Sequence, residues 1–246
     1  MVILKTPHEI ELMRLAGKIL KRIVDKLKIF VAPDKTTQEI DDYAAGLIAQ
    51  EGLTAAFKGY RGFPANICVS INEEVVHGIP SGKRIKSGDI VSLDMGLSYQ
   101  GYFADTAVTL PVGKIKPSVK KLLQATKQAL SKGIQQARVG NHLGDISYSI
   151  QRHVEANGFS VVRQFVGHGI GCKLQEEPEV PNFGKPHDGE VLKAGMVLAI
   201  EPMVNMGNWE VEILGDGWTV VTKDKMPSAH FEHTVAITEN GPEILT

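Results

Sequence analysis

Residues 85–106 read I-K-S-G-D-I-V-S-L-D-M-G-L-S-Y-Q-G-Y-F-A-D-T, and this stretch decides the fold. Its apolar and β-branched runs, interrupted by glycines, predict two strands that turn near Gly96–Gly101. Asp94 and Asp105 lie within these runs, where burying an unpaired carboxylate is costly. One carboxylate on each strand of a hairpin can face the same side, so the stretch predicts a site for a divalent cation.

The composition argues against several broad classes of protein. With 27 basic and 28 acidic residues, the formal net charge of −1 creates no broad field for nucleic acid or an anionic membrane, so we expect neither partner. Two cysteines are too few for a disulfide framework and favour a reducing compartment. Because we find neither a signal peptide nor an apolar run of ~20 residues, the sequence predicts a soluble cytoplasmic protein.

Capping signals and apolar spacing predict four helices. Thr6 and Thr36 each stand three residues before a glutamate, which is typical of a capping box. We expect helices at about 7–32, 37–51, 117–138 and 143–156. Strands are expected at 66–72, 159–166, 196–204, 209–214, 218–222 and 231–238, and a loop at 175–189.

An internal repeat joins the two ends of the chain. The run I-K-S-G-D-I-V-S-L-D, ending at Asp94, matches L-K-A-G-M-V-L-A-I-E, ending at Glu201, and F-A-D-T at 103–106 matches F-E-H-T at 231–234. Repetition over about half the chain predicts one α+β domain, 1–246, made of duplicated halves at roughly 1–113 and 114–246. Equivalent strands would then bring Asp105 and Glu232 into one cleft with the first pair.

Four carboxylates in one buried cleft require positive charge. Like charges a few Å apart in a low dielectric repel by several kcal/mol, and two divalent cations would offset that charge. His168, within G-H-G-I-G, is the expected fifth ligand, and an imidazole favours manganese, iron, cobalt or zinc. Such a pair of ions is typical of metal-assisted hydrolysis.

Each feature also has a simpler interpretation. A single carboxylate at a strand end is more often a salt-bridge or turn residue, and His168 alone would be structural. The glycines at 167–171 lack the spacing of a phosphate-binding loop. Motifs of other hydrolases, H-E-x-x-H and G-x-S-x-G, and the redox motif C-x-x-C are absent from the sequence. It is therefore the combination of these motifs, and no single one of them, that predicts a site for metal-assisted hydrolysis.

In order along the chain, five runs resemble the type I methionine aminopeptidases, metallopeptidases of the pita-bread fold. They are L-D-M-G (93–96), F-A-D-T-A (103–107), G-H-G-I-G (167–171), A-I-E-P-M (199–203) and F-E-H-T (231–234). The resemblance implies a curved antiparallel sheet with outer helices, in a monomer. It also implies removal of the initiator methionine from nascent proteins whose second residue is small.

The resemblance also implies roles for residues. Asp94 would bind one metal ion, Asp105 and Glu232 would bridge two, and His168 and Glu201 would complete the second. A metal-bridging hydroxide would attack the methionine carbonyl, with Glu201 as the catalytic proton shuttle. The second catalytic residue would be His77, hydrogen-bonded near the scissile amide. The methionine pocket would be lined by Tyr60, Phe63, Cys68, Leu174 and Trp218.

Two positions depart from the family pattern. Gln175 stands where a second active-site histidine is usual; as a substrate-binding residue it can still donate a hydrogen bond but cannot carry a proton. His230 stands two residues before Glu232, where glutamine is common. It would lie on the same strand face as Glu232, either behind the ligands or next to the metal, and is not expected to be a ligand itself. The alternatives are therefore an Xaa-Pro hydrolase of the same fold and a peptide-binding paralogue with weakened catalysis. The physiological metal and a transient ribosome contact stay open.

Overall fold

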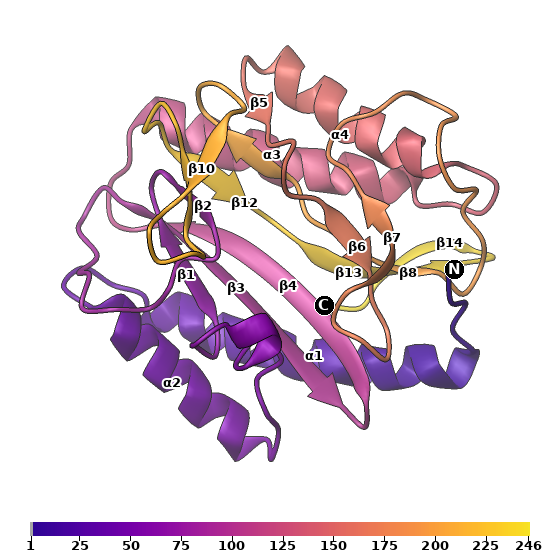
Figure 1. Ribbon diagram of the computed structural model, residues 1–246, viewed down its shortest axis with the longest axis horizontal. Coiled ribbons are helices and arrows are strands. Elements are labelled where there is room, and N and C mark those ends of the chain that lie inside the picture. Colours follow the sequence, from indigo (N-terminus) through magenta and orange to yellow (C-terminus); the bar gives the residue numbers. More distant parts are fainter. Residues whose placement is uncertain (1) are drawn as a thin grey trace.

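The computed structural model describes residues 2–246 (Figure 1). Thr6 and Thr36 each close a capping box with Glu9 and Glu39, which confirms both predicted helix starts. The four predicted helices are present, and a short 3₁₀ turn, η1 (Tyr60–Gly62), follows the second. The α-helices are α1 (Pro7–Phe30), α2 (Thr37–Gln50), α3 (Pro117–Gln136) and α4 (Leu143–Ala156).

All paired strands are antiparallel and form four small sheets, ordered β1-β3-β4, β10-β11-β2, β12-β9-β5 and β14-β13-β8-β6-β7. The strands of the N-terminal part are β1 (Cys68–Ile71), β2 (Glu74–Val76), β3 (Ile90–Tyr99) and β4 (Tyr102–Pro111). Those of the C-terminal part are β5 (Ser160–Val161), β6 (Gly167–Gly169), β7 (Glu176–Val180), β8 (Val197–Ile200), β9 (Met203–Asn205), β10 (Val211–Ile213), β11 (Val220–Thr222), β12 (Ser228–His230), β13 (His233–Thr238) and β14 (Gly241–Ile244).

The decisive stretch forms the predicted hairpin. Strands β3 and β4 pair along their whole length, from Ile90 opposite Pro111 to Tyr99 opposite Tyr102. The turn lies at Gln100–Gly101, at the far end of the interval predicted for it. Gly96 is therefore a strand residue, directly opposite Asp105.

Two segments differ from the prediction. The expected strand at 159–166 is reduced to Ser160–Val161, and the expected loop at 175–189 was wrong for Glu176–Val180, which forms strand β7. Pro178 suggested a loop, but β7 lies at the edge of the five-stranded sheet, where proline removes no hydrogen bond from the sheet interior. Its buried residues alternate, with Pro178 and Val180 pointing inward.

The predicted strands at 196–204 and 231–238 are each interrupted. Pro202 lacks an N–H, and the chain leaves β8 at Ile200 and enters β9 at Met203. Strand β13 begins only at His233, after the separate strand β12. Both breaks contain a candidate ligand, so the side chains of Glu201 and Glu232 project from irregular backbone.

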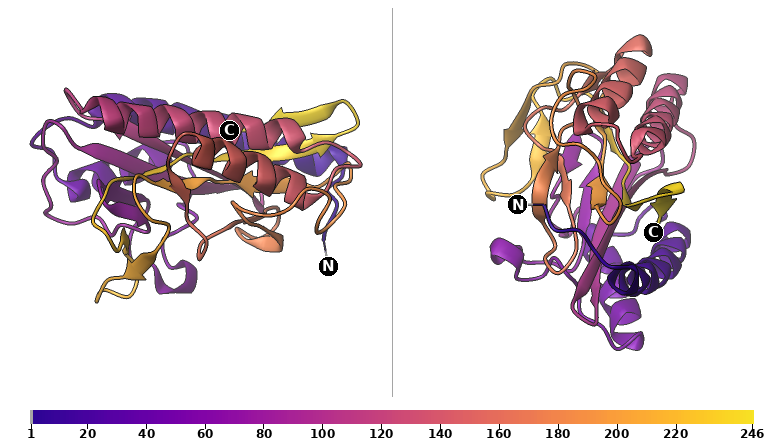
Figure 2. Two further views of the ribbon diagram at one scale, coloured as in Figure 1. Left: turned by 90° about the horizontal axis from the view of Figure 1, so that it is seen from above. Right: turned by 90° about the vertical axis from the view of Figure 1, so that its right-hand side faces the viewer.

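Helices and strands enclose two main hydrophobic cores. One packs α1 and α2 against β3 and β4, and the other packs α3 and α4 against the C-terminal strands. Figure 1 and Figure 2 show α3 and α4 side by side along one side of the molecule. The division of the chain into duplicated halves stays a prediction. Within residues 2–246, no helix combines the length and apolar character that a membrane span requires.

Threonine hydroxyls join β4 to the C-terminal strands. Thr234 Oγ1 accepts from the Asp105 N–H at 2.9 Å and donates to the Asp105 carbonyl at 2.8 Å. Thr106 Oγ1 donates to the carbonyl of Glu232 at 2.8 Å. We call this contact, made by Thr106 and Thr234, the seam. It brings the candidate ligands Asp105 and Glu232, which are far apart in the sequence, close together.

Candidate metal centre

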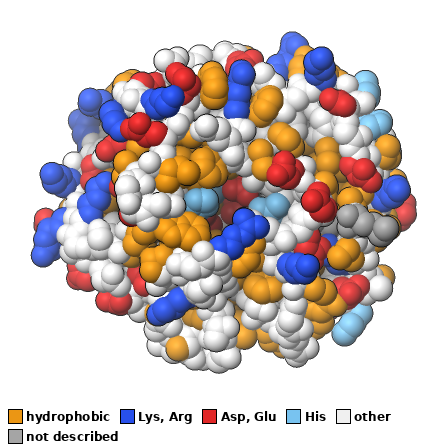
Figure 3. Space-filling view, in the orientation of Figure 1, with side chains coloured by type: hydrophobic (Ala, Val, Ile, Leu, Met, Phe, Trp, Pro, Cys, Tyr) orange, Lys and Arg blue, Asp and Glu red, His pale blue; other side chains and the backbone are white. Residues whose placement is uncertain are grey.

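A pocket opens on one face of the molecule, and acidic and histidine side chains are visible at its base beside hydrophobic ones (Figure 3). The twelve residues that the sequence suggested as catalytic, metal-binding or substrate-binding line this pocket, whereas His230 does not. They are Tyr60, Phe63, Cys68, His77, Asp94, Asp105, His168, Leu174, Gln175, Glu201, Trp218 and Glu232.

The four carboxylates come from different elements. Asp94 lies in the middle of β3, opposite Cys68 and Ala107, and Asp105 lies two pairs further along β4. Glu201 and Glu232 come from the two strand breaks. Asp94, Asp105 and Glu232 are buried, and the Glu201 side chain is 12% exposed.

Burial raises the pKa of all four carboxyl groups. The pKa of Asp94 lies well above its ordinary value because of desolvation and of the Asp105 charge. Desolvation raises the pKa of Asp105 to about 7. Glu201 and Glu232 are affected in the same direction by burial and by the neighbouring aspartates. Such a site favours bound protons or cations.

His168 is prepared to bind a metal ion. Its Nδ1 lies 2.9 Å from the Gly169 carbonyl oxygen, so Nδ1 carries the proton and Nε2 offers a lone pair. Burial lowers the pKa of this imidazole and favours the neutral form. Its Nε2 lies 3.6 Å from Oε1 of Glu201, which places a ligand nitrogen beside a ligand oxygen.

Two groups of potential ligands share Glu232. Donor atoms of Asp105, His168 and Glu232 lie within 4.8 Å of one another, as do those of Glu201, His230 and Glu232. Asp94 lines the pocket but belongs to neither group. The buried Oε1 of Glu232 has no hydrogen-bond partner in the described part of the chain. Carboxylates with a neutral imidazole fit a divalent cation of the transition series.

His77 stands at the same pocket on a strained turn. Its φ is 59°, an uncommon value for a residue other than glycine. Its ring meets those of Phe165 and Trp218 edge to face, at 5.7 and 6.1 Å between centroids. Burial lowers the pKa of His77 to about 4, so the ring is neutral at neutral pH.

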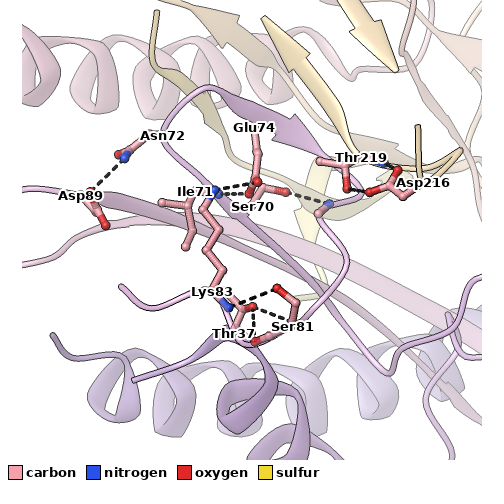
Figure 4. A network of polar contacts seen from close by, with 11 residues as sticks. Thr37, Ser70, Ile71, Asn72, Glu74, Ser81, Lys83, Asp89, Asp216 and Thr219 are labelled. Carbon is pink, nitrogen blue, oxygen red and sulfur yellow. Dashed lines mark hydrogen bonds and ion pairs between the residues drawn. The ribbon is translucent and has the colours of Figure 1, made fainter. Parts of the chain in front are cut away.

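Polar contacts around β1 and β2, among them those of Ser70, Glu74 and Lys83 (Figure 4), hold the chain next to the turn that carries His77. The N–H of Gly78 donates to Ser70 Oγ at 3.1 Å, and the Gly78 carbonyl accepts from the Val69 N–H at 2.9 Å. A Cβ at Gly78 would overlap the Val69 carbonyl oxygen, so only glycine fits. Glu74 Oε2 accepts from the Ile71 N–H at 2.6 Å and Oε1 contacts Lys83 Nζ at 2.8 Å, which fixes the connection between β1 and β2.

Rings form the apolar side of the pocket. Phe63 meets Trp218 edge to face, with 5.1 Å between ring centroids. At the mouth, the Tyr60 hydroxyl donates to Oε1 of Gln175 at 3.3 Å, which leaves the amide nitrogen of Gln175 as a donor. The buried thiol of Cys68 has its pKa raised by desolvation and by Asp94, so it acts as an apolar group.

Two lining residues, Phe57 and Arg61, did not emerge from the sequence. Phe57 packs edge to face on Phe63, with 6.4 Å between centroids. The guanidinium of Arg61 lies over the Tyr60 ring, 5.4 Å from its centroid. The only signal in the sequence was their place in a loop rich in glycine and aromatic residues, which does not reveal the direction of a side chain.

Comparisons with known proteins cover nearly the whole chain. The model of metallopeptidase family M24 matches residues 11–239. A methionine aminopeptidase of Clostridium perfringens is 56% identical over 100% of this chain and 99% of its own length. Methionine aminopeptidase 1 of Bacillus subtilis is 51% identical, with the same two coverages.

Solved structures agree with this result. The crystal structure of the methionine aminopeptidase from Thermotoga maritima superposes with a TM-score of 0.98 at 47% identity, over 100% of this chain and 99% of that one. The prolidase from Pyrococcus furiosus gives a TM-score of 0.82 at 25% identity, over 99% of this chain and 65% of that one.

Fold and site together define a class of protein. Helices outside antiparallel sheets, with buried carboxylates and an imidazole in a central pocket, are the features of a metal-dependent peptidase of the pita-bread fold. The chain belongs to metallopeptidase family M24, whose members act on peptide bonds with the help of a metal ion.

Proposed function

We propose that this chain is a methionine aminopeptidase, which removes the initiator methionine from nascent proteins when the second residue is small. The observation that carries the proposal is a single pocket that combines buried carboxylates with an apolar wall of rings. Relatives named methionine aminopeptidase that align over the whole chain support it. The chain matches the prolidase at only 25% identity, which favours this function over Xaa-Pro hydrolysis.

The metal site is proposed to hold two divalent ions. Asp94, Asp105, His168, Glu201 and Glu232 would bind them, and donor atoms of Asp105, His168 and Glu232 already lie within 4.8 Å of one another. Manganese, iron, cobalt and zinc all suit this donor set. When bound, such ions lower the pKa of water toward neutrality and polarise a carbonyl oxygen.

The protein groups would then orient the peptide and move protons. Glu201 would accept a proton from the attacking water and deliver it to the leaving amine. His77, neutral at working pH, would hydrogen-bond near the scissile amide, and Gln175 would donate from its free amide nitrogen. Neither group would need to change its charge during the reaction.

The apolar wall is proposed to recognise methionine. Phe63, Leu174 and Cys68 are buried, and Trp218 and Tyr60 are half-buried at the same pocket. A thioether packs favourably on aromatic rings and adapts to an irregular space. We further propose that the enzyme acts in the cytoplasm as a monomer, on nascent chains, with at most a transient ribosome contact.

A peptide panel tests this function. Purified protein supplied with manganese or cobalt should cleave Met-Ala-Ser and leave Ala-Pro peptides intact. The Asp94→Ala variant, measured in parallel, should lose metal and lose activity by more than the 10–100-fold typical of changes outside the ligand set. Cleavage of Ala-Pro but not Met-Ala-Ser would favour the Xaa-Pro hydrolase. Less than about one ion per chain, without peptidase activity after adding metal, would favour a peptide-binding paralogue.

A further inference from the structure

His230 lies directly behind the pocket. It is the last residue of β12, is 1% exposed and does not line the pocket itself. Its backbone is fixed on both sides, because its N–H donates to Thr109 Oγ1 and its carbonyl accepts from the same hydroxyl, both at 2.8 Å. The backbone of His230 is therefore fixed, and its ring is buried.

The ring of His230 faces Glu201. Nε2 of His230 lies 3.3 Å from Oε2 of Glu201, while Nε2 of His168 lies 3.6 Å from Oε1. Each carboxylate oxygen thus faces a different imidazole. Neither ring nitrogen of His230 forms a hydrogen bond within the described residues, so the 3.3 Å contact of Nε2 with Oε2 of Glu201 is a close approach between two polar atoms.

The choice of tautomer decides what this contact does. A neutral imidazole has one N–H and one lone pair. If Nε2 bears the hydrogen, it can donate to Oε2 of Glu201, and only an acceptor at Nδ1 is left without a partner. If Nε2 instead bound a metal ion, Nδ1 would carry a buried N–H without an acceptor, which is costly. The first arrangement leaves less unsatisfied polar surface.

We infer that His230 is a positioning residue for Glu201. The Nε2–H group, 3.3 Å from Oε2, holds that oxygen on its own side and leaves Oε1 turned toward His168, so that the carboxylate is oriented before metal binds. This inference rests on the proposed role of Glu201 as a metal ligand and proton shuttle. Because His230 itself does not reach the pocket, its effect on the substrate would pass only through Glu201.

Three variants at one position separate this role from simple packing. The amide nitrogen of glutamine reaches about as far as Nε2 of histidine, whereas that of asparagine reaches only as far as Nδ1. His230→Gln should therefore keep the contact with Glu201, and His230→Asn should lose it. His230→Leu keeps a buried side chain of similar bulk but offers no donor.

The full-length protein, stripped of metal by chelation, is titrated with manganese in a calorimeter. His230→Leu and His230→Asn should bind Mn²⁺ about 10- to 100-fold more weakly than wild type, the range typical of groups that orient ligands. His230→Gln should stay within about threefold, or ~0.7 kcal/mol, of wild type. With metal in excess, His230→Leu should lower kcat for Met-Ala-Ser and leave KM unchanged.

The outcomes that overturn the inference are distinct. Wild-type Mn²⁺ affinity in His230→Leu would remove any role for the ring nitrogen. Equal loss in His230→Gln and His230→Leu would mean that the imidazole itself binds metal or packs. Circular-dichroism melting without metal checks that each variant folds. If His230→Leu does not fold, the difference in Mn²⁺ affinity between His230→Gln and His230→Asn still tests the inference. Failure of wild type to cleave methionyl peptides would reject the proposed function and leave the metal titrations valid.

Discussion

At the scale of a residue, burial raises the pKa of Asp105 and makes the stability of the metal-free protein depend on pH. Burial raises its pKa from 3.8 to about 7, so the folded metal-free protein keeps a proton that the unfolded chain releases above pH 4. The folded state then binds more protons than the unfolded state, and stability falls as pH rises through this interval. A divalent ion bound there would take the place of protons and offset the repulsion between the carboxylates.

Replacing Asp105 tests this account. In a chelator, the melting temperature of wild type should fall between about pH 4 and pH 7, and Asp105→Asn should flatten that fall because an amide does not titrate. Melting curves by circular dichroism across this range measure the effect. Asp42→Asn, a change at an exposed site on α2, serves as the control and should keep the wild-type slope. A slope unchanged in Asp105→Asn would contradict the prediction.

Gln175 is the second residue with a definite prediction. Gln175→His should raise kcat for methionyl peptides, by about tenfold at most, because a charge-assisted hydrogen bond is roughly twice as strong as a neutral one. Metal affinity should change little, since the side chain of Gln175 hydrogen-bonds to Tyr60 and, among the described residues, to none of the candidate ligands. Steady-state kinetics measures kcat, and calorimetric titration with Mn²⁺ measures the metal affinity. An unchanged or lower kcat would show that the glutamine does not limit the reaction.

At the scale of elements, breaks between strands and one short strand position three of the candidate metal ligands. Glu201 and Glu232 lie at breaks between strands, and His168 lies on β6, which is only three residues long. Glycines on both sides of His168 let the backbone of β6 approach its neighbours. A Cβ at Gly169 would overlap the Glu177 carbonyl oxygen, and one at Gly167 would overlap the Ala199 carbonyl oxygen.

Gly169→Ala should therefore separate β6 from β7 and displace His168. We expect about 1–3 kcal/mol of destabilisation, as for other overpacked sites, together with weaker Mn²⁺ binding. Gly82→Ala is the matched control, because nothing lies within 4 Å of the added Cβ there. Chemical denaturation and metal titration of both variants measure the result. Equal stability of the two variants would mean that the backbone at β6 adapts without cost.

At the scale of the whole molecule, the site lies on the seam between the two main cores. Thr234 and Thr106 tie β4 to the C-terminal strands, and the candidate ligands come from both sides of that seam. An ion held by Asp105 and Glu232 would therefore connect parts of the chain that are 127 positions apart in the sequence. Metal binding should stabilise the folded molecule as a unit.

This coupling predicts a shift of the melting temperature. Manganese at about 100 times its Kd should add ~2.7 kcal/mol to the free energy of unfolding, which corresponds to roughly 5–10 °C for a chain of this size. The transition should remain single, since both cores share the ligands. Calorimetry with and without chelator measures it, and Asp94→Ala should show a smaller shift. Two separate transitions in the presence of metal would contradict the prediction that the two cores unfold together.

The sequence by itself determined the features that depend on near neighbours and on composition. Threonine caps begin α1 and α2. Apolar and β-branched runs and the turn at Gly101 form the β3–β4 hairpin, and the positions of Asp94 and Asp105 within it indicated a cation site. The five motifs indicated the family, and one residue of each lines the pocket, namely Asp94, Asp105, His168, Glu201 and Glu232. Local free-energy terms of this kind are encoded within a few residues.

Only the tertiary structure decided how distant segments meet. Pairing with β6 made a strand of β7 despite Pro178, and the breaks in the C-terminal sheets turned Glu201 and Glu232 inward. The same packing put Phe57 and Arg61 in the wall of the pocket and the ring of His230 behind Glu201. These placements depend on contacts between residues far apart in the chain, which spacing within one segment does not specify.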